Sequence, residues 1–200
     1  MKKADKNPNN LNQLRKTLVL TGIKHCGKTT QGKLLSSFFG CDFFDTDDLV
    51  TEMTGKSPRE IYSEEGRGAF MKAEAEACAS LVSKKGVFVV STGGGICNND
   101  AAVAELKKIG LFVFLNSDED TACDRIIKEV KILENGELSN LPAYIAKENP
   151  KSIDDVRKSF HNFYVERQKI YKSICDIEVE MMHVSKSENM ERIVSAVQSA

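Results

Sequence analysis

Short runs of apolar residues alternate along the chain with longer segments in which apolar positions recur at helical spacing. Four of the runs are apolar at almost every position, which is typical of strands buried on both faces. A fifth run alternates between apolar and polar residues. The predicted strands are Thr17–Thr21, Cys41–Phe44, Val87–Ser91, Leu111–Leu115 and, for the alternating run, Ile177–Val184.

The segments between these runs predict helices. Lys28–Phe39 carries its leucines and phenylalanines on one side and is followed by Gly40, a typical helix stop. Ser57-Pro58 is a helix-start signal, and a charged turn is expected at Glu64–Gly68. The remaining helices are expected at Ala69–Lys84, Ala101–Ile109, Asp118–Leu133, Ile153–Tyr171 and Glu188–Val197.

Strands that alternate with helices predict βαβ units and a parallel sheet with helices on both faces. We therefore expect a three-layer α/β/α fold. Residues 1–16 are polar, without the apolar stretch of a secretory signal, and are expected to be a flexible leader before a single domain at 17–200. Residues 134–150, here called the lid segment, show no firm period and are expected to be mobile.

Composition narrows the functional classes. The 200 residues are 41% hydrophobic and 28% charged with a net charge of -1, so the chain has no general attraction for nucleic acid or anionic membranes. No apolar run reaches the roughly 20 residues of a membrane span. The six cysteines include no C-x-x-C pair, which favours reduced thiols in a cytoplasmic protein. We expect a monomer that binds a small-molecule substrate, without nucleic-acid or membrane partners.

One motif carries strong chemical information. Gly22 to Thr29 reads GIKHCGKT and fits G-x-x-x-x-G-K-[ST] between a predicted strand and a predicted helix. Glycines let backbone N–H groups turn towards a phosphate, and the helix N-terminus adds positive partial charge. Lys28 can reach the β- and γ-phosphates, and the Thr29 hydroxyl can ligate Mg²⁺. This motif indicates a nucleotide-phosphate site but does not separate kinases from GTPases, ATPases or motor domains.

Three further groups follow predicted elements. Asp45 and Asp47 come after the second strand, Gly93-Gly94-Gly95 after the third, and Arg167 lies late in the 153–171 helix. A carboxylate beside the phosphate loop can hold a metal-bound water or receive a substrate proton, and ligands bind at this end of an open α/β sheet. Consecutive glycines let backbone approach a ligand closely. The alternative for each aspartate is N-capping of the next helix.

In this order and spacing, the motif, D-T-D, T-G-G-G and the late arginine resemble the shikimate kinase family over about residues 17–184. The resemblance implies a P-loop kinase with a five-stranded sheet, a lid over the nucleotide, and ATP and Mg²⁺ as cofactors. It implies transfer of the ATP γ-phosphate to shikimate, in aromatic amino acid biosynthesis. The implied nucleotide-binding residues are Gly22, Cys26, Gly27, Lys28, Thr29, Thr30 and Arg125, the last against the adenine.

The resemblance also divides the remaining residues between metal and substrate. It implies that Thr29 and Asp45 serve the metal, and that Lys28 and Asp47 are catalytic, with Asp47 binding the acceptor hydroxyls and receiving the proton. Gly93, Gly94 and Gly95 would form the turn beside the substrate, and Arg167 would grip the shikimate carboxylate.

Two positions depart from the family pattern. The family has Phe-Arg where this chain has Phe70-Met71, and Arg-Pro where it has Leu141-Pro142. Since a hydrogen bond to a charged group contributes about 1.5–3 kcal/mol, losing both arginines would weaken substrate or transition-state binding by about 10² to 10⁴. Three hypotheses remain open: a shikimate kinase with compensating lysines, a kinase for another hydroxy acid or polyol, and an ATP-binding regulatory module without turnover.

Overall fold

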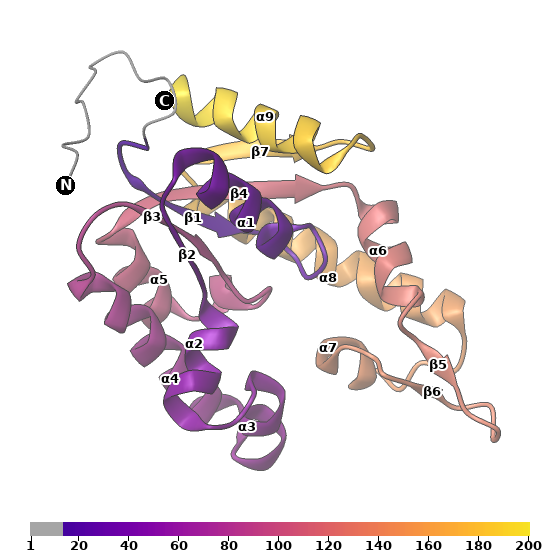
Figure 1. The fold of residues 1–200 in the computed structure, drawn as a ribbon. Helices are drawn as coiled ribbons and strands as arrows, with labels where there is room; N and C mark the ends of the chain where they lie inside the picture. Colours follow the sequence, from indigo (N-terminus) through magenta and orange to yellow (C-terminus); the bar gives the residue numbers. More distant parts are fainter. Residues whose placement is uncertain (1–13) are drawn as a thin grey trace.

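Five strands form one parallel sheet in the order β2-β3-β1-β4-β7 (Figure 1). The structure is a computed structural model that describes residues 14–200. All five strands were predicted, and the strand that leads into the phosphate loop lies at the centre. Their bounds are Thr17–Thr21 (β1), Asp42–Asp45 (β2), Phe88–Ser91 (β3), Gly110–Ser117 (β4) and Ile177–Met181 (β7).

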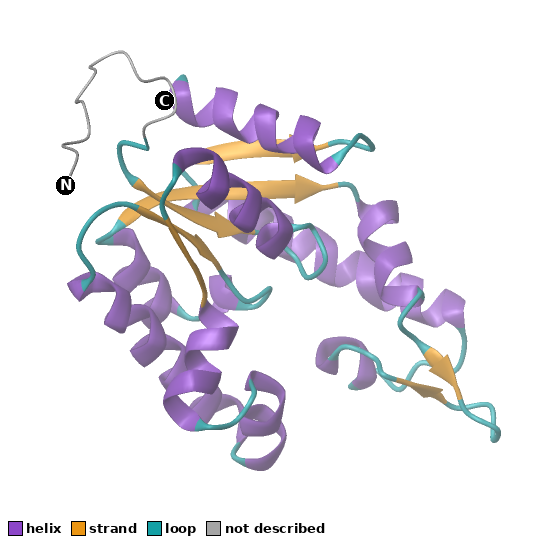
Figure 2. Ribbon diagram, in the orientation of Figure 1, coloured by secondary structure: helices purple, strands orange, loops and turns teal. Residues whose placement is uncertain are grey.

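Helices cover both faces of this sheet (Figures 1 and 2). On one face α1 (Lys28–Phe39) packs beside α9 (Lys186–Gln198), and on the other lie α5 (Asp100–Lys107) and α8 (Ile153–Ile174). The three-layer α/β/α prediction is therefore confirmed. Within residues 14–200, no helix combines the length and apolarity that crossing a bilayer requires.

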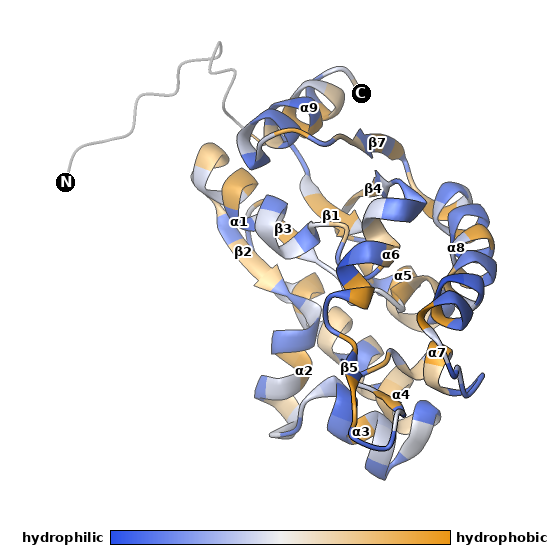
Figure 3. Cartoon of the chain, turned by 90° about the vertical axis from the view of Figure 1, so that its right-hand side faces the viewer, coloured by the Kyte–Doolittle hydropathy of each residue, from blue (hydrophilic) through white to orange (hydrophobic). Residues whose placement is uncertain are grey.

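The burial pattern explains the strands. Every residue of β1 and β3 is buried, whereas the edge strand β7 alternates between more and less exposed residues, as its sequence does. Figure 3 shows the apolar positions on the strands and on the inner sides of the helices. Of the leader expected at 1–16, residues 1–13 lie outside the described part, but Leu14 is only 5% exposed and belongs to the main core.

A small helical unit follows β2. It consists of α2 (Thr46–Thr54), α3 (Pro58–Glu64) and α4 (Gly66–Ser80), which continues as a short 3-10 helix at Leu81–Ser83. These helices share a second small core. The helix start at Ser57-Pro58 is confirmed by a full capping box.

Two predictions in this unit need correction. Helix α2 was not predicted, and the charged turn expected at Glu64–Gly68 is only the break at Glu65 between α3 and α4. Helix α4 therefore begins earlier than expected, at Gly66. A left-handed backbone at Gly66 (φ 88°) lets the chain change direction at that point without a longer loop.

The chain after β4 also differs from prediction. The helix expected over Asp118–Leu133 ends at Ile127 (α6, Glu119–Ile127), because Lys131 and Ile132 pair with a later strand. The lid segment, whose sequence shows no firm period, contains one strand of this hairpin and a short helix. The additional elements are β5 (Lys131–Ile132), β6 (Leu138–Ser139) and α7 (Ala143–Ala146).

The lid segment reaches the small helical unit. Arg59 Nη1 donates to Asn140 Oδ1 at 3.4 Å, and Lys147 Nζ lies 3.4 Å from the hydroxyl of Tyr62. Both contacts join helix α3 to residues far along the chain. The lid segment and helix α3 thus meet through these two side-chain contacts.

Candidate active site

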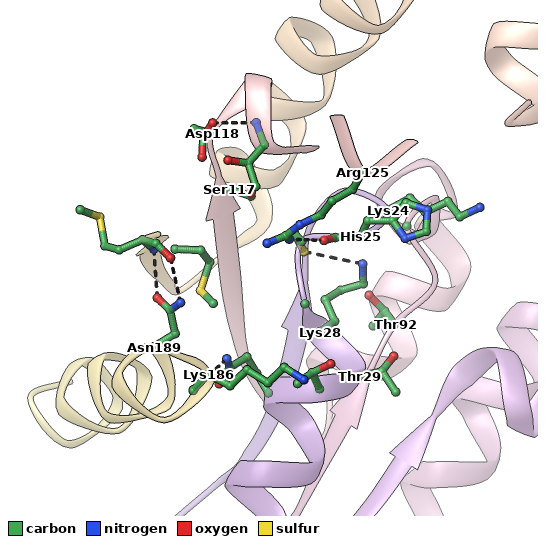
Figure 4. A pocket seen from close by; sticks show the side chains of 18 of the residues that line it. Lys24, His25, Lys28, Thr29, Thr92, Ser117, Asp118, Arg125, Lys186 and Asn189 are labelled. Carbon is green, nitrogen blue, oxygen red and sulfur yellow. Dashed lines mark hydrogen bonds between the residues drawn. The ribbon is translucent and has the colours of Figure 1, made fainter. Parts of the chain in front are cut away.

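The phosphate loop connects β1 to α1 and lines a cleft of about 1000 Å³ (Figure 4). Gly22 has φ 144°, and a Cβ there would lie 2.8 Å from the carbonyl oxygen of Leu115. Gly27 has φ 102° and precedes the first residue of α1. Only glycine fits the first position, so the loop curls tightly around the N-terminus of α1, where backbone N–H groups are free to meet an anion.

Lys28 lies inside this loop. Its side chain is 7% exposed, and Nζ donates to the carbonyl oxygens of Gly22 and Ile23 at 2.9 Å each. Nζ also lies 3.8 Å from the sulfur of Cys26. The positive charge of Lys28 is therefore held inside the phosphate loop, next to the N-terminus of α1.

Thr29 and Asp45 meet across the sheet. The hydroxyl of Thr29 donates to Asp45 Oδ2 at 2.9 Å and lies 3.3 Å from the hydroxyl oxygen of Ser91. Asp45 Oδ1 accepts from the backbone N–H of Asp47 at 3.1 Å, which caps helix α2. The capping alternative thus holds for Asp45, in addition to its contact with Thr29, and does not hold for Asp47, which lies inside the helix.

These oxygens fit a magnesium ion. Mg²⁺ takes hard oxygen ligands and usually binds through one or two protein groups together with substrate phosphates. Among the described residues, no group of three His, Cys, Asp or Glu side chains is arranged to hold a metal. The Thr29 hydroxyl and the Asp45 carboxylate would supply two ligands of Mg²⁺, and phosphate oxygens and water would fill the other ligand positions.

Asp47 faces the turn after β3. A Cβ on Gly93 would lie 2.8 Å from Asp47 Oδ1, and the backbone N–H of Gly93 donates to the buried hydroxyl of Thr46 at 3.0 Å. Burial, followed by the charge of Asp45, raises the pKa of Asp47 to about 6. A carboxyl with that pKa is suited to accept a proton near neutral pH.

The triple-glycine turn lies directly against the phosphate loop. A Cβ on Gly94 would come within 2.8 Å of the backbone nitrogen of Lys24, and the carbonyl oxygen of Gly94 accepts from Tyr171 on α8 at 2.9 Å. Gly95 has open space around it. The turn therefore brings the Asp47 side of the cleft next to the phosphate side.

Helix α6 closes the opposite side of the phosphate loop. Arg125 is exposed, lines the cleft and donates to the backbone carbonyl of His25 (Figure 4). Glu129 lies 3.9 Å from Lys24 Nζ and 3.4 Å from His25 Nε2. Burial is the main cause that lowers the pKa of His25, which favours the neutral ring.

Arg167 is half-buried on α8. Its Nη1 donates to the sulfur of Cys97, and its guanidinium lies 4.8 Å from the centroid of the Phe163 ring. Arg167 does not line the main cleft, and neither do Gly22 and Gly95. The cleft does bring together all the other predicted residues, namely Cys26, Gly27, Lys28, Thr29, Thr30, Asp45, Asp47, Gly93, Gly94 and Arg125.

Comparison with known proteins identifies the group to which this arrangement belongs. The family model described as shikimate kinase matches residues 24–198. The chain belongs to the shikimate kinase family. A shikimate kinase of Psychrobacter sp. is 31% identical over 164 residues, with 82% of each chain covered.

Solved structures of shikimate kinases have the same fold. The enzyme from Aquifex aeolicus is 28% identical with a TM-score of 0.67, covering 92% of this chain and 96% of its own. The enzyme from Acinetobacter baumannii, in complex with shikimate, is 22% identical with a TM-score of 0.72, covering 92% and 93%. The predicted resemblance and the P-loop kinase fold are confirmed.

Both departures from the shikimate kinase pattern remain apolar positions in the structure. Met71 is half-buried on α4, and Leu141 packs against the main core. Three lysines near the lid segment could compensate: Lys128 lines the cleft, Lys131 pairs with Ser139 in the β5–β6 hairpin, and Lys147 contacts Tyr62. Lys128 is thus the best placed of the three.

Sequence reasoning missed Glu74. This residue lies in a helix rich in Ala and Glu, where glutamate usually faces water, yet it is 1% exposed. Its Oε1 is 3.3 Å from the same Cβ position on Gly93 that Asp47 approaches. A glutamate at i+3 from Met71 was the available signal, because those two positions share one helix face.

Replacing Gly94 by alanine should lower kcat, whereas Gly68→Ala, at an open position of helix α4, should leave it unchanged. A Cβ at Gly94 would collide with backbone of the phosphate loop, and displacing reacting groups by about 1 Å can cost on the order of 10²-fold. Steady-state kinetics and circular dichroism of both variants would check this. Equal activity of the two variants would show that the contact with Lys24 does not position the loop.

Proposed function

We propose that this protein is an ATP-dependent kinase that transfers the γ-phosphate of ATP to a hydroxyl of shikimate. One observation carries the proposal. The half-buried carboxyl of Asp47 lies at a glycine turn that touches the phosphate loop holding Lys28, so a hydroxyl activated by Asp47 would be next to a bound γ-phosphate. Membership of the shikimate kinase family supports the choice of reaction.

In this mechanism the protein positions the reactants and neutralises charge. The phosphate-loop N–H groups and Lys28 hold the β- and γ-phosphates. Asp47 orients the acceptor hydroxyl and accepts its proton as the new O–P bond forms, while the bond between the γ-phosphorus and the β–γ bridging oxygen breaks and ADP leaves. Thr29 and Asp45 would hold Mg²⁺, which supplies charge neutralisation at the phosphates when bound.

The remaining site residues keep the roles that the resemblance implies. Gly22, Cys26, Gly27 and Thr30 would surround the phosphates, and Arg125 would lie against the adenine. Gly93, Gly94 and Gly95 would contact the acceptor, and Arg167 would bind its carboxylate. The lid segment would close over the nucleotide and exclude water, which suppresses hydrolysis of ATP.

We further propose that the protein works as a cytoplasmic monomer within a single kinase domain at 17–200. Its product would enter aromatic amino acid biosynthesis, the process to which the shikimate kinase family belongs. Sedimentation velocity of the full chain would test the monomer. A stable dimer at micromolar concentration would contradict it.

The identity of the acceptor needs a direct test, because Met71 and Leu141 carry no charge where the family has arginines. A coupled ATP-turnover assay should therefore compare shikimate with a panel of small polyols and hydroxy acids. The proposal expects shikimate to be turned over, with a KM raised by the missing arginines. Turnover of another acceptor alone would favour a rebuilt pocket, and no turnover at all would favour the regulatory module.

Introducing an arginine at position 71 should lower the KM for shikimate by about 10-fold or more, since a gain of about 1.4 kcal/mol is a factor of ten. Adding Leu141→Arg should raise kcat instead, because a lid arginine meets the phosphate as charge develops. Steady-state kinetics of the single and double variants would separate the two effects.

Met53→Arg is the matched control for Met71→Arg, because Met53 is 51% exposed on α2 and the same change there adds a cation away from the acceptor. It should leave KM unchanged. If Met71→Arg gives no shikimate turnover while the native protein phosphorylates another acceptor, the shikimate assignment is wrong and the kinase assignment stands.

A further inference from the structure

Glu74 is a carboxyl group buried in the middle of α4. It is 1% exposed, Oε2 accepts from Asn99 Nδ2 at 2.8 Å, and Oε1 has no hydrogen-bond partner. An ionised oxygen that is buried and unpaired is strongly unfavourable, whereas a neutral carboxylic acid is tolerated far better. The contact with Asn99 occupies Oε2, so a bound proton would sit on Oε1.

The neighbours of Glu74 also favour the neutral form. Oε1 and Asp47 Oδ1 lie 3.3 Å and 2.8 Å from the same point above Gly93, and two negative charges that close repel each other. Burial first, and then Asp47, raises the pKa of Glu74 to about 7 against the opposing effects of Asn99 and Arg167.

The groups facing Glu74 come from four elements. Asp47 comes from α2 and Arg167 from α8, while Asn99, which caps α5, is uncharged. Cys78 lies one turn along α4, and burial raises the pKa of its thiol to about 12, so it stays neutral. Met71, one turn before Glu74, provides no countercharge. Arg167 is thus the one cation that acts on Glu74 among the described residues.

We propose that Glu74 is a neutral carboxylic acid with its proton on Oε1, and that loss of this proton weakens the binding of an anionic acceptor. The neutral acid offers a hydrogen-bond donor at the turn where Asp47 faces the cleft. Once ionised, Glu74 repels an acceptor carboxylate and competes with it for Arg167. An anionic acceptor that binds to the ionised form therefore takes up one proton from solvent at Glu74.

This inference rests on the proposed function in one respect, namely that the acceptor carries a carboxylate. Its kinetic test is the pH dependence of KM for shikimate. KM should rise by up to about tenfold for each pH unit above the pKa of Glu74. Glu74→Gln keeps a neutral donor of similar shape, so its KM should stay flat across the same range. Glu76→Gln, at an exposed position of the same helix, should reproduce the native profile.

A second measurement does not depend on activity. In protein labelled with ¹³C at the glutamate side-chain carboxyls, the resonance absent from Glu74→Gln belongs to Glu74 and should titrate near pH 7. If that variant fails to fold, Met71→Arg identifies the same resonance, because a neighbouring guanidinium should lower its pKa.

The outcomes separate the two proposals. A Glu74 resonance that titrates near the ordinary value of about 4.3 overturns the inference whatever the acceptor. A flat KM profile in the native protein overturns it as well. If the resonance titrates near 7 but no anionic acceptor is phosphorylated, the proposed function fails and takes the anionic-acceptor half of the inference with it, while the neutral state of Glu74 stands.

Discussion

Lys28→Met should reduce phosphoryl transfer by at least on the order of 10² to 10³ and leave the fold in place. Nζ is fixed by two carbonyl oxygens of the phosphate loop, so the cation is already positioned where charge develops on the transferring phosphoryl group. Methionine has a similar length and no charge. A coupled assay of ATP turnover with shikimate would measure the loss.

The control for this variant is Lys33→Met, which removes an exposed cation from the same helix. It should keep full activity. Lys28→Met leaves two loop carbonyls without their donor, at a cost of about 1–3 kcal/mol, so circular dichroism and a thermal melt must accompany the kinetics. Near-native turnover by a folded Lys28→Met protein would refute the phosphate-loop assignment.

Asp47→Asn should lower kcat by about 10² to 10⁴, the usual contribution of a positioned general base, and leave the affinity for ATP nearly unchanged. Asparagine keeps the shape of the side chain but cannot take up the proton. In the native protein, kcat should fall as pH drops through about 6, where Asp47 becomes protonated and can no longer act as a base. The variant should lose this acid limb.

Asp48→Asn tests whether the effect belongs to position 47, because Asp48 is exposed on the next position of the same helix. It should behave like the native protein. Calorimetric titration with ATP gives the second readout. A large loss of ATP affinity in Asp47→Asn would mean that Asp47 serves the metal and that its role and that of Asp45 are exchanged.

The strands were predictable because their signal is local. A buried parallel strand must be apolar at nearly every position, so β1 and β3 are visible as short apolar runs without knowledge of their partners. The phosphate loop was equally clear, since its glycines are required by backbone geometry at the N-terminus of α1. Helix α1 was predicted with both of its ends for the same reason.

Two of the errors arose where a contact outside the helical pattern itself decides the structure. Residues 128–133 continue a helical pattern, but pairing of Lys131 and Ile132 with β6 ends the helix at Ile127. Glu74 resembles a surface glutamate until the turn at Gly93 and the side chain of Asn99 bury it. Neither the end of α6 nor the burial of Glu74 can be predicted from the periodicity of the residues around it.

The position of β1 in the sheet has a consequence for how the chain folds. Although β1 is the first strand, its partners arrive late: Thr17 contacts Phe88, 71 residues further on, and Thr21 contacts Val113, 92 residues further on. The strand that carries the phosphate loop therefore has no strand partner on the ribosome until the chain has been made through β3, at residues 88–91. Such distant pairing makes folding slow and leaves apolar β1 open to aggregation in the meantime.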